Sequence, residues 1–363
     1  MIKVKKIVRA LISLVILFVI SYLIFIFPFD ILSSWLGNPS KLHESLLATS
    51  VIFTLCLYYF KSKSTNKIIK FFVYEGFGIG TVSFFIILPL IVFSYFQILI
   101  NYQLVITFFS IQIPVIIYGY MNSKKLKIKR LSIESNLINE SINFVFISDV
   151  HIGSNHPSSL KKLVSKINSL DFNFLVIGGD LIDSSAFQIN DLYELKKIEK
   201  PIFFVTGNHE YYIQNHKEHL QDLKSVGIKI LENESLQLDG INMIGLSDNI
   251  TNKSKIEYVE KLSQKDLFNL LIVHKPSIWK KVSHNANLML SGHTHNGQIF
   301  PFNFVVKLQF PQNYGLYKNK KNHLYVSSGS ATWGPKIRIG SNNEIIHIAV
   351  SYTHLRAHET SLH

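Results

Sequence analysis

Four apolar runs in the first third of the chain restrict how it can fold. They cover residues 7–27, 45–60, 77–100 and 102–120, and contain almost no charged side chain. A helix of about 20 apolar residues matches the thickness of the bilayer hydrocarbon, and it satisfies its own backbone hydrogen bonds there. The runs predict a transmembrane region of about four helices over residues 1–120. The run 7–27 is also compatible with an uncleaved signal sequence, and the shorter run 45–60 with a re-entrant or interfacial segment.

Basic residues flank these runs. The chain carries 37 Lys and Arg against 24 Asp and Glu, a formal net charge of +13, and much of the excess lies beside the apolar segments: Lys3, Lys5, Lys6, Arg9, Lys61, Lys63, Lys67, Lys70, Lys124, Lys125, Lys127, Lys129 and Arg130. This placement favours membrane lipids as the partner of the charge, and no nucleic-acid partner is expected. Because basic flanks stay on the cytoplasmic side, four spans in an inner or plasma membrane predict a cytoplasmic catalytic domain. If residues 45–60 do not cross, the same rule places that domain outside.

The rest of the chain alternates short apolar strands with helices. We interpret residues 121–142 as a basic linker and first strand, and residues 143–350 as a catalytic domain. Buried strands are predicted at 143–148, 172–177, 201–205, 269–273 and 287–290, with a helix over 158–169. Strands with continuous apolar runs are covered on both faces, which is typical of an α/β fold. Each of these strands is followed by polar residues, and ligands bind at that edge of open α/β sheets.

Five short motifs follow these strands in order, and together they suit a metal centre. They are Asp149-x-His151, Gly179-Asp180, Gly207-Asn208-His209-Glu210, His274, and Gly292-His293-x-His295. Two divalent metals that share a carboxylate need hard oxygen ligands together with imidazoles, which is the mixture found here. The single cysteine, Cys56, lies in an apolar run, so a cysteine-based metal site or a disulfide within the chain is excluded. A metal must therefore be held by oxygen and imidazole nitrogen.

The ordered motifs resemble those of the calcineurin-like metallophosphoesterases, particularly their bacterial membrane-associated branch. The resemblance covers roughly residues 143–350, and includes the run from Gly292 to Pro301 and the Tyr325-Val-Ser-Ser-Gly329 strand and turn. It implies a two-sheet α/β sandwich preceded by the transmembrane helices. One departure is Asn296, which stands where this branch often has glycine and bears on substrate fit more than on metal binding.

Carried over by position, the resemblance implies two divalent metal ions of Mn, Fe or Zn. One would be held by Asp149, His151, Asp180 and His295, and the other by Asp180, Asn208, His274 and His293. Asp180 would then bridge the two ions. His209 matches the histidine that stabilises the phosphoryl charge or protonates the leaving oxygen, and Asp183 matches the carboxylate that orients this histidine.

The chemistry that follows is hydrolysis of a phosphomonoester, phosphodiester or pyrophosphate bond by a metal-bridging hydroxide. The substrate would be a phosphorylated small molecule or a lipid-linked molecule. The alternative is a function of a different class, a membrane transporter or sensor that uses the metal-binding domain for regulation. The predicted spans contain no clear charge, and charges inside a membrane usually mark transport paths. A scaffold that has lost activity is disfavoured because no expected ligand is missing.

Some of these residues also have simpler interpretations. Asp149 and Asp180 could each merely end a strand, and His274 could be a loop residue before Lys-Pro. The Ser-rich run 327–330 lacks the lysine of a phosphate-binding loop and the flanks of a nucleophile elbow, so we interpret it as a turn. Residues 351–363 do not continue the pattern of 344–350 and resemble a translated adapter, so we predict a non-native tail and assign its histidines no ligand role.

Overall fold

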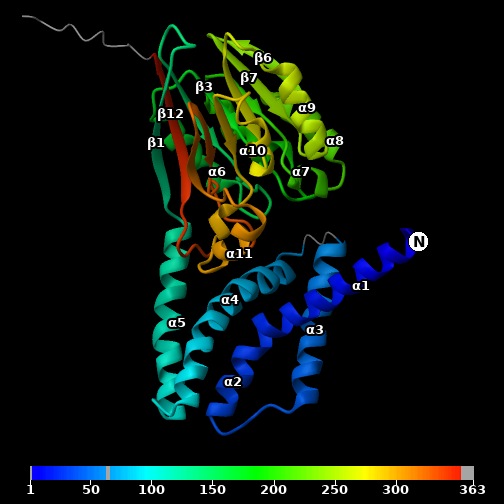
Figure 1. The fold of residues 1–363 in the computed structure, drawn as a ribbon. Coiled ribbons are helices and arrows are strands. Elements are labelled where there is room, and N and C mark those ends of the chain that lie inside the picture. Colours follow the sequence, from blue (N-terminus) through cyan, green and yellow to red (C-terminus); the bar gives the residue numbers. More distant parts are fainter. Residues whose placement is uncertain (1, 63–65, 353–363) are drawn as a thin grey trace, which may run out of the picture. The chain divides into compact units, whose positions relative to one another are not determined.

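The computed structural model describes residues 2–62 and 66–352 of the chain. These residues form two compact units (Figure 1). The helical unit consists of the chain up to Lys124 together with two later segments, Ile299–Pro301 and Gly334–Gly340. The second unit consists of Lys125–Gln298, Phe302–Trp333 and the chain from Ser341. The chain therefore returns twice to the helical unit from within the domain that carries the five motifs.

The helical unit has four helical stretches long and apolar enough to cross a membrane among its described residues. The first, Ala10–Trp35, runs without a break through α1 (Ile2–Ser21), the π-helical turn η1 (Tyr22–Ile26) and α2 (Phe27–Trp35). Pro28 explains the wide turn, because proline lacks an N–H and its ring crowds the carbonyl one turn earlier. The other three are α3 (Leu42–Ser62), α4 (Lys67–Tyr95) and α5 (Asn101–Ser123).

The helices are longer than the predicted apolar runs and include acidic residues beyond their limits. Helix α4 begins ten residues before the predicted span, so Glu75 lies inside it. Both carboxylate oxygens of Glu75 accept the backbone N–H of Lys336, at 3.3 and 3.2 Å. Asp30 likewise falls within the first candidate span. Both acidic residues lie outside the predicted apolar runs, so the prediction that those runs lack a clear charge stays a prediction.

The second unit contains two six-stranded mixed sheets, as the predicted two-sheet α/β fold requires. The first has the order β1-β12-β2-β3-β4-β5 and the second β10-β11-β9-β8-β7-β6. The strands are β1 (Leu126–Ser135), β2 (Ile142–Ile147), β3 (Phe174–Ile177), β4 (Ile202–Phe204), β5 (Ile228–Ile230), β6 (Glu234–Leu238), β7 (Ile241–Leu246), β8 (Phe268–Val273), β9 (Leu288–Ser291), β10 (Gly315–Asn319), β11 (Asn322–Val326) and β12 (Asn343–Tyr352).

This unit also has helices, which are α6 (Ser158–Asn168), α7 (His209–Tyr212), α8 (His216–Ser225), α9 (Asn252–Leu262), α10 (Trp279–Val282) and α11 (Phe302–Gln309), with the short turns η2 (Ile189–Lys197), η3 (Pro276–Ile278) and η4 (His295–Gly297). Of these, α6, α8, α9 and α10 pack on the outer faces of the two sheets. Strand β2 shows how the layers form. Phe144 and Phe146 pack into the core between the sheets, whereas Val145 and Ile147 pack beneath α6, η2 and α8. Alternate side chains of a strand point to opposite faces, so a fully apolar strand serves two cores.

The first and the last strand of this unit pair with each other in the first sheet. Strand β1, from the region interpreted as linker and first strand, pairs in parallel with β12 along its whole length, from Leu126 opposite Asn343 to Ser135 opposite Tyr352. Ser351 and Tyr352, the first residues of the suspected tail, continue this strand. The remaining tail positions lie outside the described residues.

Parallel pairing brings the motif-bearing strand ends together within each sheet. In the first sheet β2, β3 and β4 run in parallel, and in the second β8 and β9 do so. Each predicted strand lies within two residues of an observed one. Since parallel strands end at the same edge, the loops after these five strands lie where a ligand is expected in an α/β fold.

Candidate metal centre

Asp149, His151 and His295 form the first of two adjacent clusters, one ligand atom of each lying within 4.8 Å of the others. The Nε2 atoms of His151 and His295 are 3.1 Å apart, and Nε2 of His295 is 3.5 Å from Oδ1 of Asp149. All three residues are buried. Three potential ligands thus face one point from loops after β2 and β9.

Asp180, His274 and His293 form the second cluster, defined by the same separation of ligand atoms. Nε2 of His274 lies 3.0 Å from Oδ2 of Asp180. The Nδ1 atom of His274 is 2.8 Å from the carbonyl oxygen of Gly178, and a hydrogen bond there leaves Nε2 as the free ligand atom. Asp180 also reaches the first cluster, because its Oδ2 is 4.0 Å from Nε2 of His151.

Asn208 stands between Gly207 and His209, whose backbones both meet Asp180, and it offers a ligand of another kind. It directly precedes α7, and the residue is buried. Its Oδ1 atom has no hydrogen-bond donor among the described residues. A buried amide oxygen without a donor is costly. A hard divalent cation would satisfy this oxygen, so Asn208 fits the donor set of the two clusters.

His209 lies at the edge of both clusters between aromatic rings. Its Nε2 atom is 3.9 Å from Oδ2 of Asp180, and its backbone N–H donates to Oδ1 of the same carboxylate at 2.9 Å. The ring meets those of His151, Tyr212 and Trp333 edge to face, at centroid distances of 4.7, 5.4 and 5.4 Å. Burial lowers the pKa of His209 to about 4, so at neutral pH the ring is an uncharged donor.

Asp183 contacts a different histidine from the one that the resemblance suggests most directly. Its Oδ2 atom is 3.3 Å from Nδ1 of His151, and Ser154 donates its backbone N–H to Oδ1 at 2.6 Å. Asp183, His151 and His209 also lie within 4.8 Å of one another through single ligand atoms. The carboxylate is therefore placed to orient His151 and to act on His209 through charge.

The charges of the site are organised around Asp180. Burial by itself raises the pKa of Asp180, but the charge of His274 and the hydrogen bond from it outweigh burial and hold the pKa well below its ordinary value. Conversely, burial lowers the pKa of His274, while Asp180 outweighs this and raises it to about 10. The pair is a carboxylate and an imidazolium in the metal-free chain. A divalent cation would replace the imidazolium proton.

The backbone is strained where the clusters form. Asp149, His151, Asp180, His293 and His295 all have positive φ, between 48 and 74°. Non-glycine residues rarely adopt this left-handed conformation, and each costs free energy that the surrounding structure must supply. Gly207 removes a further obstacle, because a Cβ atom there would collide with Oδ1 of Asp180. The surrounding fold therefore holds these five residues in a strained conformation where the two clusters form.

Glu210 is a further functional candidate. It ends the Gly207-Asn208-His209-Glu210 motif, but no role was predicted for it. It is fully buried, and its carboxylate accepts four backbone N–H groups, from Asp180, Leu181, Ile182 and Gly207, at 2.7 to 3.1 Å. Burial raises its pKa to about 7. The carboxylate joins the loop after β3 to the loop after β4. The sequence feature that could have indicated this role is a charged residue directly after Gly-Asn-His, close behind a predicted buried strand.

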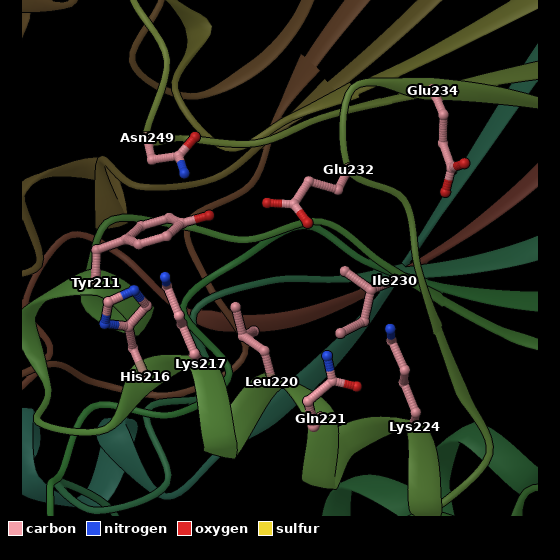
Figure 2. A pocket seen from close by; sticks show the side chains of 10 residues that line it. All are labelled: Tyr211, His216, Lys217, Leu220, Gln221, Lys224, Ile230, Glu232, Glu234 and Asn249. Carbon is pink, nitrogen blue, oxygen red and sulfur yellow. The ribbon is translucent and has the colours of Figure 1, made fainter.

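A cavity of about 540 Å³ opens beside α7 and α8. Figure 2 shows Lys217, Leu220, Gln221 and Lys224 extending from α8 toward a space that Tyr211 and Glu232 also border. The ten lining residues include none of the predicted metal ligands. Tyr211 connects the cavity to the strand ends, because its hydroxyl lies 2.9 Å from that of Thr206 and 2.6 Å from that of Ser247.

Comparison with known proteins agrees with this geometry. Residues 142–297 match the family model of the calcineurin-like phosphoesterases. The chain is similar to an uncharacterized metallophosphoesterase of Campylobacter jejuni, with 36% identity over 64% of this chain and 65% of the relative, and to one of Helicobacter pylori, with 33% identity over 63% and 65%. It is 30% identical to a transmembrane protein with metallophosphoesterase domain of Danio rerio, over 64% of this chain and 60% of the relative. The alignments thus span just under two thirds of each relative.

Proposed function

Because residues 142–297 match the family model of the calcineurin-like phosphoesterases and the chain resembles bacterial metallophosphoesterases, we propose that it is a membrane-anchored, dinuclear metal-dependent phosphohydrolase. It would hydrolyse a phosphomonoester, phosphodiester or pyrophosphate bond. The observation that carries the proposal is the convergence of two acid and imidazole clusters on one carboxylate, Asp180. Two divalent ions bound there would activate water and neutralise the phosphate charge.

The side chains divide into ligands and groups that act on the substrate. Asp149, His151 and His295 would hold one ion, Asn208, His274 and His293 the other, and Asp180 both. The set of carboxylate, amide and imidazole donors suits Mn, Fe or Zn. The neutral ring of His209, at the edge of both clusters, would donate its N–H to a phosphoryl oxygen or to the leaving oxygen. Asp183 would fix the ring of His151 and bias the orientation of His209.

We expect His209→Ala to bind two metal ions as the unmodified chain does, yet to lose about a hundredfold or more in turnover, because a donor to the developing phosphoryl charge is removed. Metal content is measured by mass spectrometry, and turnover with Mn against aryl phosphodiesters, nucleotides and lipid phosphates. His284 lies outside the five motifs, so His284→Ala is the matched control. Full activity of His209→Ala would remove the ring from the mechanism. Absence of hydrolysis by the unmodified chain on the whole panel would count against the proposed activity.

We place the catalytic unit in the cytoplasm. Helix α3 has 21 residues, about 31 Å at the rise of an α-helix, which is enough to cross the hydrocarbon. With four crossings, the Lys-rich flanks and the catalytic unit lie on one side, which the positive-inside rule makes cytoplasmic.

This topology predicts opposite results for two reporter fusions. Green fluorescent protein fused after Lys125 should fluoresce in cells, and periplasmic alkaline phosphatase fused after Asn38 should be active, since the two sites lie on opposite sides of the membrane. An inactive phosphatase after Asn38, or a dark fluorescent protein after Lys125 in an expressed fusion, would contradict the cytoplasmic placement.

A further inference from the structure

Helix α11 (Phe302–Gln309) exposes a group of apolar side chains on the surface of the catalytic domain. Phe302, Phe304, Val305 and Leu308 are 40, 59, 49 and 85% exposed, and the helix has no buried residue. Phe304, Val305 and Leu308 are spaced at i, i+1 and i+4, which places them on one side of the helix. Contiguous apolar surface of this kind marks an interaction site on a soluble domain.

Both ends of α11 are fixed to the loop that carries His293 and His295. At its start, a Cβ atom on Gly297 would collide with the backbone of Asn303, so the helix lies directly against η4. After its end, the buried ring of Phe310 meets the ring of His293 edge to face at 5.1 Å. Wherever the exposed side of α11 docks, the candidate metal centre is held nearby.

Chain connectivity and composition indicate what covers this surface. Phe302 follows Pro301, and the segment Ile299–Pro301 belongs to the helical unit that has four candidate membrane spans. The residue before α11 thus belongs to the same compact unit as the candidate membrane spans. The exposed Lys307 adds a cation that can reach lipid phosphates while the apolar side chains enter the acyl boundary.

We propose that α11 is an interfacial helix that inserts its apolar side chains into the bilayer and holds the metal-site loop at the level of the lipid headgroups. The substrate class follows, and this part rests on the proposed function: a phosphoester of a membrane amphiphile whose acyl chains stay in the bilayer while its phosphate reaches the metal centre.

The insertion is tested without measuring activity. Cys56 is replaced by alanine in the full chain, and Phe304→Cys or Leu308→Cys is added and labelled with an environment-sensitive fluorophore. Tyr193, an exposed aromatic residue of η2 at 47% exposure, supplies the control Tyr193→Cys. In vesicles of phosphatidylcholine and phosphatidylglycerol that carry a nitroxide near the glycerol backbone, we expect quenching at 304 and 308 to exceed that at 193 by about twofold or more, as for a helix at the acyl boundary.

Equal lipid quenching at all three positions, with equal access to aqueous iodide, would overturn the insertion of α11. The substrate class has a separate readout. Leu308→Ser should lower the ratio of turnover on vesicle phospholipid to turnover on a short-chain, water-soluble analogue by about tenfold, because the apolar contact with the bilayer is weakened. An unchanged ratio would overturn the substrate class. If the unmodified chain hydrolyses neither substrate, the proposed function fails while the quenching still decides whether α11 inserts.

Discussion

Asp180→Ala should reduce turnover by at least about a thousandfold, equivalent to roughly 4 kcal/mol of transition-state stabilisation. Asp180 is the carboxylate that approaches both clusters, with Oδ2 3.0 Å from Nε2 of His274 and 4.0 Å from Nε2 of His151. Its removal leaves neither cation with the shared ligand that holds two ions at one phosphate. The measurements are metal content per chain and steady-state hydrolysis with Mn.

Asp266, an exposed aspartate, gives the matched control Asp266→Ala, which should keep both metal ions and normal turnover. Thermal unfolding of the metal-free variants separates a lost ligand from a lost fold. Two bound ions and undiminished hydrolysis in Asp180→Ala would contradict the bridging role.

Glu210→Ala should lower the free energy of unfolding of the catalytic unit by about 3–5 kcal/mol, because four buried backbone N–H groups lose their acceptor. The same groups belong to the loops that carry Asp180 and Asn208. Metal affinity should therefore fall together with stability. Denaturant unfolding in detergent, followed through Trp279 and Trp333, measures the first effect, and metal titration the second.

Glu210→Gln keeps one acceptor oxygen but turns an amide N–H₂ toward backbone donors, so it should fall between the unmodified chain and the alanine variant. Glu218 in α8 is exposed, and Glu218→Ala should change stability by less than about 0.5 kcal/mol. A Glu210→Ala protein as stable as Glu218→Ala would show that the four donors find other partners.

At the candidate metal centre, the sequence predicted the ligand residues but not the role of Glu210. The motifs predicted Asp149, His151, Asp180, His274, His293 and His295 as ligands, and the structure brings these residues together. Their roles as metal ligands stay a prediction, as does that of Asn208. No sequence pattern joins Glu210 to the loop after β3, because that contact spans about thirty residues and depends on how β3 and β4 pair. The contact of Asp183 with His151 likewise appears only in the folded chain.

For the candidate membrane helices too, the sequence predicted some features and only the structure showed others. Apolar runs located the four helical stretches, because their length and composition are local properties. They did not predict that the first stretch continues past Pro28 to Trp35, or that Glu75 lies inside α4 with its carboxylate on a backbone N–H more than 250 residues later in the chain. These features depend on contacts between segments far apart in sequence.

By itself the sequence determined the class of the fold, the strands that end in polar residues and the types of metal ligand that are present. Hydrophobic periodicity and side-chain chemistry are properties of short stretches of sequence. Tertiary structure alone decided the pairing of β1 with β12, the left-handed backbone of five ligand candidates, and the exposure of α11. Those features arise from packing between distant segments, and strain at five positions persists only because the surrounding sheets and buried hydrogen bonds outweigh it.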